Sequence, residues 1–221
     1  EDDDLFDGGW GQAYDESPDY SYQIDVYLPD FQTPDWMKNA VVYQIFPDRF
    51  YNGDPKNDAS PTDPTVYGDP VLPRAWGDLP EGYCRAYEGA ACDEEPQGRD
   101  FYGGDLEGVK QRLDYLGELG VTAIYFNPIF HAPSNHLYDT TDYYKIDPYF
   151  GSIGTYKSLV NLAAKRGIHV ILDGVFNHTS SDSVYFDKYG RYPEVGAYES
   201  QDSRYYDWYS FYAWPDDYNA W

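Results

Sequence analysis

Two stretches of the sequence combine residues whose oxygen atoms suit a hard cation. The segment RFYNGDPKND (49–58) places Asn and Asp side chains at close spacing, and FYGGDLEG (101–108) adds a carboxylate beside two glycines with unobstructed carbonyls. The candidate ligands are Asn52, Asp54, Asn57, Asp58, Gly103 and Asp105. Calcium takes about six to eight such oxygens. N-G-D and K-N-D are also common turn sequences, so the first stretch taken alone favours a turn.

Polar side chains also follow the second and third apolar segments of the chain. The second is followed by a long loop that contains His136, Tyr138 and Asp142, and the third by DGVFNH, which begins with Asp173 and ends with His178. If these segments are parallel strands, their carboxyl ends meet at one edge, where ligand sites are built. The alternatives are a loop held by internal hydrogen bonds and, for Asp173, a capping role.

Hydrophobic periodicity predicts the elements that must position these residues. Continuous apolar runs at 40–46, 121–126 and 168–172 indicate strands buried on both faces, as a parallel sheet requires. Apolar residues recur at helical spacing over 106–119 and 156–163, and a glycine closes each helix.

Strand, helix, strand, helix, strand in this order predicts right-handed crossover units of an α/β protein. The loops after the strands are long and polar, while the helix-to-strand connections are short, which is the asymmetry expected of a (β/α)8 barrel. A doubly wound sheet is the alternative, but no Gly-rich phosphate turn follows any of these strands. Three units do not close a barrel, so we expect the chain to be the opening portion of a larger domain.

Composition excludes several classes of partner. The chain has 221 residues, with 15 Lys and Arg against 39 Asp and Glu and a formal net charge of −24. This charge works against nucleic acid and anionic membranes, and no apolar run of about 18 residues predicts membrane insertion. Aromatic residues make up 19% of the chain. Rings with polar tips suit large, neutral, hydroxylated ligands, although an aromatic-rich core explains the number equally well.

Cys84 and Cys92 lie close together in one stretch rich in Gly, Glu and Ala. Two thiols with no His at ligand spacing do not make a zinc site. An even count in one loop favours a small disulfide, and hence an oxidising compartment. Two reduced thiols in a cytosolic protein are the alternative.

The order of these motifs resembles that of a known family. YQIFPDRF, N-G-D…N-D, GGDLEG, SNHLYDTTDY and DGVFNHTS together resemble the α-amylase family of glycoside hydrolases, above all its neopullulanase, cyclomaltodextrinase and amylopullulanase branch. The resemblance covers residues 34–190. It implies an acidic linker and lead-in strand over 1–33, the first part of the catalytic (β/α)8 barrel over 34–176, and the start of a small inserted domain over 177–221.

The resemblance also implies roles for single residues. The six candidate ligands match the calcium site near the start of the barrel in this branch. Tyr138 matches the tyrosine that stacks under the sugar next to the scissile bond, and His178 the histidine that bonds that sugar's primary hydroxyl. Asp173 matches the carboxylate that orients the arginine of the site. His136 and Asp142 resemble supporting residues, whereas no role carries over to His131 or His169, which we expect to be structural.

The family cleaves α-glucosidic bonds with retention of the anomeric configuration. It uses an aspartate nucleophile, a glutamate general acid and a second aspartate that stabilises the transition state. These residues follow later strands, so we expect this segment alone to be inactive and to need the rest of its own catalytic domain. The expected function is that of the N-terminal segment of a secreted hydrolase of starch, pullulan or maltooligosaccharides. A non-catalytic amylase-like partner or binding protein is the alternative. The presence of both Tyr138 and His178 argues against this alternative, because a non-catalytic relative has no use for a complete sugar-binding subsite.

Overall fold

The computed structural model describes residues 30–64, 66, 68–80 and 98–219. The chain divides into two compact units, Glu1–Asn39 and Ala40–Trp221. In the first unit the described residues contain one short helix, α1 (Asp35–Lys38). The predicted lead-in strand before residue 30, and both cysteines, lie outside the described residues.

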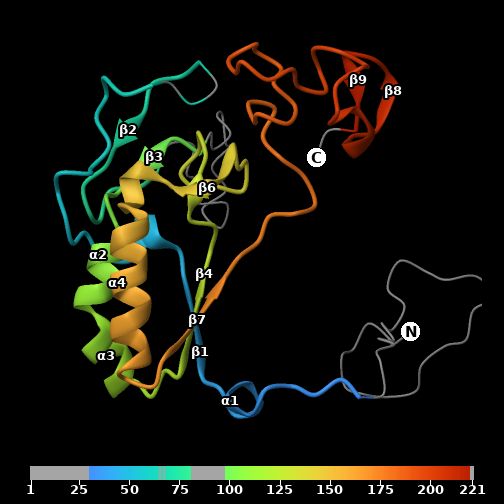
Figure 1. Cartoon of the computed structure of the whole chain (residues 1–221). Coiled ribbons are helices and arrows are strands. Elements are labelled where there is room, and N and C mark those ends of the chain that lie inside the picture. The colour runs from blue at the N-terminus through green and yellow to red at the C-terminus, as the bar shows by residue number, and fades with distance from the viewer. Residues whose placement is uncertain (1–29, 65, 67, 81–97, 220–221) are drawn as a thin grey trace, which may run out of the picture. The chain divides into compact units, whose positions relative to one another are not determined.

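A three-stranded parallel sheet forms the centre of the second unit (Figure 1). The strands β1 (Val42–Ile45), β4 (Ala123–Phe126) and β7 (His169–Leu172) pair in chain order and confirm the three predicted strands. Val42 and His169 both pair with Ala123, so the strands begin and end in register. Their carboxyl ends therefore lie at one edge of the sheet.

Three helices connect these strands and lie along the same face of the sheet (Figure 1). They are α2 (Leu106–Gln111), α3 (Leu113–Glu118) and α4 (Ile153–Ala164). The single helix predicted over 106–119 is wrong in one respect, because the chain leaves helical geometry at Arg112, where φ is −102° and ψ is 10°. The Arg112 guanidinium lies 3.9 Å from the centre of the Tyr51 ring at this break.

The core lies between the sheet and the helices. Alternate strand residues point into it, including Ile45 and Phe126, and meet buried leucines of the helices such as Leu113 and Leu159. Full burial of such side chains contributes about 1.5–3 kcal/mol each. Within the described residues the helices cover only one face. The prediction of burial on both faces is therefore wrong for β1, where Val42 is exposed, and Leu119, expected in the core, is exposed at the end of α3.

Both predicted glycine terminations are confirmed. Gly120 has a φ of 80° and Gly167 a φ of 70°, the left-handed conformation that glycine adopts without steric cost. The next residues close the helix ends, because Val121 N donates to Leu116 O and Ile168 N to Ala163 O, each at 3.0 Å. Because the helices end in this way, β4 and β7 begin only a few residues after α3 and α4.

The loops contain more regular structure than the sequence predicted. β5 (Phe130–His131) pairs with β6 (Asp142–Ile146), β8 (Phe211–Ala213) with β9 (Asp217–Tyr218), and β2 (Leu72–Pro73) with β3 (Asp100–Phe101). The described residues also contain the single-turn 3-10 helices η1 (Pro47–Arg49), η3 (Pro148–Phe150) and η4 (Tyr206–Trp208). Both antiparallel pairs contain register shifts, which break the alternation from which strands are predicted.

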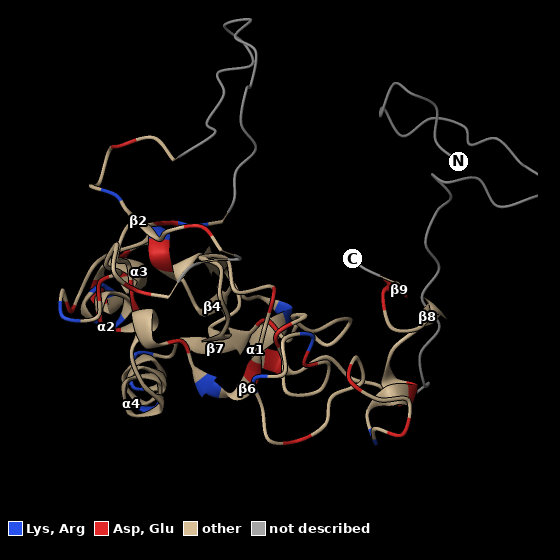
Figure 2. Ribbon diagram, turned by 90° about the horizontal axis from the view of Figure 1, so that it is seen from above, with Lys and Arg blue, Asp and Glu red and all other residues tan. Residues whose placement is uncertain are grey.

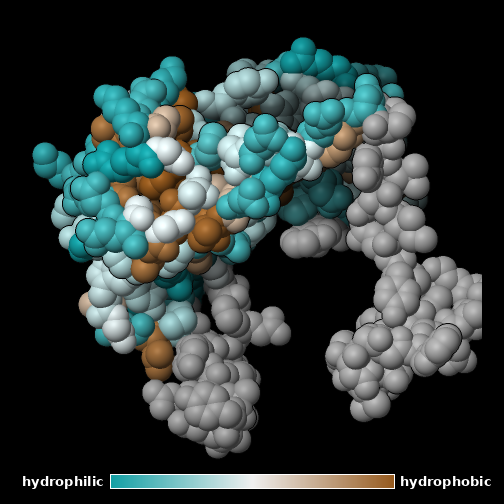
Figure 3. Space-filling model, turned by 90° about the horizontal axis from the view of Figure 1, so that it is seen from below, coloured by the Kyte–Doolittle hydropathy of each residue, from teal (hydrophilic) through white to brown (hydrophobic). Residues whose placement is uncertain are grey.

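The surface matches the acidic composition. In the coloured part of Figure 2, Lys and Arg stand singly among more numerous Asp and Glu. Viewed from below, hydrophobic residues gather over the half of the second unit that carries the sheet and helices (Figure 3). Exposed apolar side chains in that half include Val41, Val42 and Leu119. No helix within the described ranges is both long and apolar enough to cross a membrane.

Candidate functional site

Two of the predicted sugar-binding residues meet at the carboxyl edge of the sheet. Asp173 directly follows β7, and Tyr138 lies in the loop between β5 and β6. The Tyr138 hydroxyl donates a hydrogen bond to Asp173 Oδ2 at 2.9 Å. Asp173 N in turn donates to Phe126 O at the end of β4. The carboxylate is thus fixed by the sheet and holds the tyrosine.

An unusual backbone conformation directs Tyr138 and its neighbour His136. Leu137, between them, has a φ of 59° and a side chain that is only 1% exposed. Non-glycine residues adopt this left-handed conformation rarely, and it occurs where the surrounding structure imposes it. Tyr138 N donates to His136 Nδ1 at 3.1 Å, and the two rings lie 6.0 Å apart. The buried leucine therefore anchors a turn that presents both rings on the same side.

His178 joins the same group. Its Nε2 lies 3.0 Å from the carbonyl oxygen of Tyr138. Because a carbonyl can only accept, Nε2 donates in this bond, which leaves Nδ1 on the other side of the ring. Asn177 Nδ2 lies 3.5 Å from that Nδ1. Tyr138, Asp173 and His178, predicted from separate segments, are brought together.

A cavity of about 860 Å³ opens beside this group. His136, Tyr138 and His178 line it, whereas Asp173 contacts it through Tyr138. Asp142 lies on β6, away from the lining, and binds Lys145 Nζ at 2.8 Å. The cavity volume falls within the range of roughly 300–1,000 Å³ that is typical of small-molecule sites.

The protonation of Tyr138 suits binding rather than proton transfer. Burial, followed by the hydrogen bond to Asp173 and the charge of that carboxylate, raises the pKa of Tyr138 to about 12. Burial and then Asp173 also raise the pKa of Tyr125, which lies on β4 on the sheet face away from the helices. Both phenols stay protonated at neutral pH and surround one carboxylate.

Sequence reasoning missed Tyr143, which holds the loop that carries His178. The Tyr143 hydroxyl donates to the carbonyl oxygens of Val175 at 2.6 Å and His178 at 2.9 Å. Its ring lies 6.1 Å from that of Phe176 in a stacked arrangement. Burial raises the pKa of Tyr143 to about 12, so the donor proton is retained. Tyr143 ends the motif SNHLYDTTDY, but nothing in the motif predicts these bonds, because both carbonyls come from a distant loop.

The predicted cation ligands also come together, around the amino end of α2. Asp105 is fully buried and caps the helix, because its Oδ1 accepts from Gly108 N at 2.6 Å. The same oxygen accepts from Gly53 N, and Oδ2 accepts from Asp54 N and Asn57 Nδ2. These four bonds use about all the lone pairs of a carboxylate. As placed, Asp105 therefore fixes the loop that carries the other candidates.

Two amide oxygens in this loop have no hydrogen-bond partner. Asn52 Oδ1 and Asn57 Oδ1 are both buried and unbonded, although each amide nitrogen donates to a carboxylate. Such orphaned oxygens are costly without a ligand. Burial raises the pKa of Asp58. The hydrogen bond from Asn52 opposes this rise, and the negative charges of Asp105 and Asp54 add to it. A cation would satisfy the oxygens and relieve this repulsion.

Gly103 completes this group. It has a φ of 77°, and an added Cβ would lie 2.6 Å from Asn52 Nδ2 and 2.7 Å from Asp58 Oδ1. Within the described residues, no group of three or more His, Cys, Asp or Glu side chains is arranged to hold a metal. A cation here would therefore depend on amide and main-chain oxygens in addition to carboxylates, as calcium sites do.

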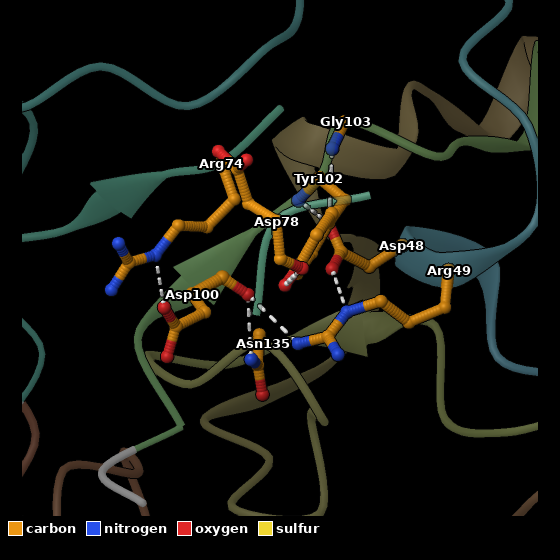
Figure 4. Close-up of polar contacts among 8 residues, drawn as sticks. All are labelled: Asp48, Arg49, Arg74, Asp78, Asp100, Tyr102, Gly103 and Asn135. Atoms are coloured by element: carbon orange, nitrogen blue, oxygen red, sulfur yellow. Dashed lines mark hydrogen bonds and ion pairs between the residues drawn. The ribbon is translucent and has the colours of Figure 1, made fainter. Parts of the chain in front are cut away.

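A second buried carboxylate holds the adjoining strand in place (Figure 4). Asp48 Oδ1 accepts from Tyr102 N at 2.9 Å and Gly103 N at 3.2 Å, and its Oδ2 accepts from Arg49 Nε at 2.7 Å. Burial raises the pKa of Asp48, although these donors oppose the shift. Arg49 also donates to Asp100 O at 3.1 Å. This network, which sequence reasoning did not single out, sets the position of the Gly103 carbonyl.

The two remaining histidines lie apart from both groups. His131 is on β5 with its Nδ1 3.3 Å from Asp147 Oδ2, and the hydrogen bond to Asp147 raises its pKa. His169 is exposed at the start of β7. Neither lines the cavity.

Comparison with known proteins identifies the family. The family model of the alpha-amylase catalytic domain matches residues 44–219. The chain belongs to the alpha-amylase family. The amylopullulanase of Thermoanaerobacterium saccharolyticum is 48% identical over 210 residues, which are 92% of this chain and 16% of that protein. Neopullulanase 2 of Thermoactinomyces vulgaris is 46% identical over 179 residues, 81% of this chain and 25% of that protein. This alpha-amylase family chain thus spans a small part of its curated relatives' length.

Solved structures of the alpha-amylase family confirm the fold. The type III pullulan hydrolase from Thermococcus kodakarensis matches with a TM-score of 0.66 at 34% identity, covering 84% of this chain and 31% of that one. The cyclic alpha-maltosyl-(1→6)-maltose hydrolase from Arthrobacter globiformis, in complex with its cyclic saccharide, matches with a TM-score of 0.65 at 32% identity. It covers 86% of this chain and 37% of that one. The three parallel units are the first part of a (β/α)8 barrel, as predicted.

The Tyr143 contacts lead to a stability prediction. Tyr143→Phe keeps the ring and removes the donor shared by Val175 O and His178 O, so we expect a loss of about 0.5–1.5 kcal/mol in the free energy of unfolding. Urea denaturation of wild type and of the Tyr143→Phe variant measures this difference in the free energy of unfolding. Tyr144→Phe is the matched control, since Tyr144 is 89% exposed and should change the midpoint very little. Equal midpoints for the Tyr143 and Tyr144 variants would show that these contacts do not hold the loop.

Proposed function

We propose that the protein containing this chain is a retaining hydrolase of starch, pullulan or related maltooligosaccharides. The observation that carries the proposal is the cavity beside Tyr138 and His178 at the carboxyl edge of the sheet, where barrel enzymes place their sites. Relatives named amylopullulanase and neopullulanase support the choice of α-1,4- and α-1,6-linked glucans as substrates.

In this proposal the chain binds and orients the sugar. The Tyr138 ring stacks on one face of a glucosyl residue, and its orientation is fixed by the bond to Asp173. His178 offers a hydrogen bond to a hydroxyl of the same residue, with its position set by Tyr138 O and the Tyr143 contact. Retention requires a nucleophile and a general acid about 5–5.5 Å apart. We assign both to the rest of the catalytic domain.

We further propose that calcium binds at the loop around the amino end of α2. The orphaned oxygens of Asn52 and Asn57, the repelling carboxylates and the glycine cradle support this choice. The proposed ligands are Asn52, Asp54, Asn57, Asp58, Gly103 and Asp105. Asp105 would act as a ligand by giving up one of its present bonds. Bound calcium supplies positive charge that fixes this loop against α2.

An extracellular location and a Cys84–Cys92 disulfide complete the proposal. The acidic composition and the pair of cysteines in one stretch support them. A disulfide over so short a loop would contribute roughly 2–3 kcal/mol if its geometry is unstrained.

Hydrolysis tests the proposed activity. In the longest natural chain that contains these residues, Tyr138→Ala should lower kcat/KM on maltooligosaccharides by about tenfold to a hundredfold, because the stacking platform is lost. Tyr138→Phe should lose less, since the ring remains. Tyr212→Ala removes an exposed tyrosine away from the cavity and should match wild type. If wild type binds α-glucans but releases no reducing sugar, the protein is a non-catalytic relative and the proposal is wrong.

Metal removal tests the calcium site. Calcium restored to the chelator-treated protein should raise its melting temperature. At a calcium concentration of a hundred times Kd, the free energy of unfolding should increase by about 2.7 kcal/mol. Asp58→Asn should weaken this response. Asp69→Asn, which removes an exposed carboxylate paired with Arg99, should leave it intact. A melting temperature that is unchanged by chelator and by calcium rules the site out.

A further inference from the structure

The cavity beside Tyr138 continues to an exposed tryptophan that the proposed reaction does not use. Trp208, the last residue of η4, lines the same cavity as Tyr138 and His178 and is 64% exposed. An exposed aromatic residue alone needs no explanation. The Trp208 ring differs from such a residue because neighbouring rings hold it in place.

Two tyrosines hold the indole of Trp208. The ring of Tyr205, which is buried, lies 5.0 Å away edge to face, and that of Tyr185 lies 5.4 Å away. Trp208 N also donates to Tyr205 O at 3.0 Å. Tyr205 belongs to a small aromatic core with Phe186 and Ala197, so the support is itself packed. An indole fixed in this way has little rotamer freedom left to lose when a ligand stacks on it.

The supporting rings connect Trp208 to the first sugar site. Tyr185 lies 6.4 Å from Tyr143, the residue that holds the His178 loop. The Tyr209 hydroxyl, next to Trp208, lies 2.7 Å from Thr179 Oγ1 in the segment that follows His178. His178 and Trp208 therefore line one cavity, and direct contacts join the segments that carry them.

The chemistry of this wall favours a neutral, hydroxylated ligand. Among the described residues that line the cavity there is no Lys or Arg, and Asp139 is the only acidic one. Apart from the imidazoles of His136 and His178, the remaining polar side chains are hydroxyls and amides, such as Ser210 and Asn219, between aromatic rings. Aromatic faces bind the C–H faces of sugars while hydroxyls and amides bond their polar edges.

We propose that Trp208 is a second stacking platform, which binds a glucosyl residue of the same glucan beyond the one on Tyr138. The cavity then binds several sugar units, and Trp208 determines the preference for longer chains. This inference rests on the proposed glucan hydrolase function and deepens it.

Substrate length separates this role from a general effect on the fold. In the longest natural chain that contains these residues, Trp208→Ala should lower kcat/KM on maltoheptaose by about tenfold and on maltotriose by less than about twofold, because in this proposal the indole binds a sugar unit that only the longer substrate supplies. Trp208→Phe should recover part of the loss because a ring is restored. Trp76→Ala is the matched control: Trp76 is 51% exposed and outside the cavity, so both substrates should behave as with wild type.

Two results would overturn the inference. An equal loss on both substrates would assign Trp208 to the fold, and no loss on maltoheptaose would show that the indole contacts no sugar. If wild type hydrolyses neither substrate, the proposed function fails separately. Calorimetric binding of maltoheptaose and maltotriose to wild type and to both Trp208 variants then decides the inference: a weakening confined to maltoheptaose supports it, and any other pattern contradicts it.

Discussion

The hydrogen bond from the Tyr138 hydroxyl to Asp173 joins the two loops on which the candidate site depends. Asp173 is fixed because it follows a strand of the parallel sheet, and Tyr138 lies on a long loop that the sheet alone does not position. The bond therefore fixes the loop of Tyr138 to the end of the sheet. His178 then donates to the carbonyl oxygen of Tyr138, so hydrogen bonds fix the positions of all three residues relative to one another.

Buried aspartates repeat this principle elsewhere in the loops. Asp48, Asp105, Asp147 and Asp187 are each at most 1% exposed, and each accepts hydrogen bonds from two or more backbone N–H groups. Charge-assisted bonds of this kind are stronger than neutral ones and offset the cost of burial. Part of the acidic composition thus serves to order irregular backbone rather than to cover the surface.

The sequence predicted the elements whose signals are local. Apolar runs identified β1, β4 and β7, and the predicted glycines lie two and three residues beyond the last residues of α3 and α4. The hairpins were missed because their strands are short and shifted in register. Motif resemblance found Tyr138, Asp173 and His178, but it gave no role to Tyr143, which bonds a loop distant in the sequence, or to Trp208, which packs on Tyr185 as well as on the nearby Tyr205. Only the folded chain reveals such pairings.

The proposed glucan-binding function depends on one contact, in which Tyr138 and His178 together bind a glucosyl residue at the carboxyl edge of the sheet. A crystal structure of the longest natural chain with maltotriose bound tests it most directly. We expect a pyranose ring packed on Tyr138, a sugar hydroxyl within hydrogen-bonding distance of His178, and a retained bond between Tyr138 and Asp173. Maltotriose bound elsewhere, or a Tyr138 ring turned away from both Asp173 and the sugar, would contradict it.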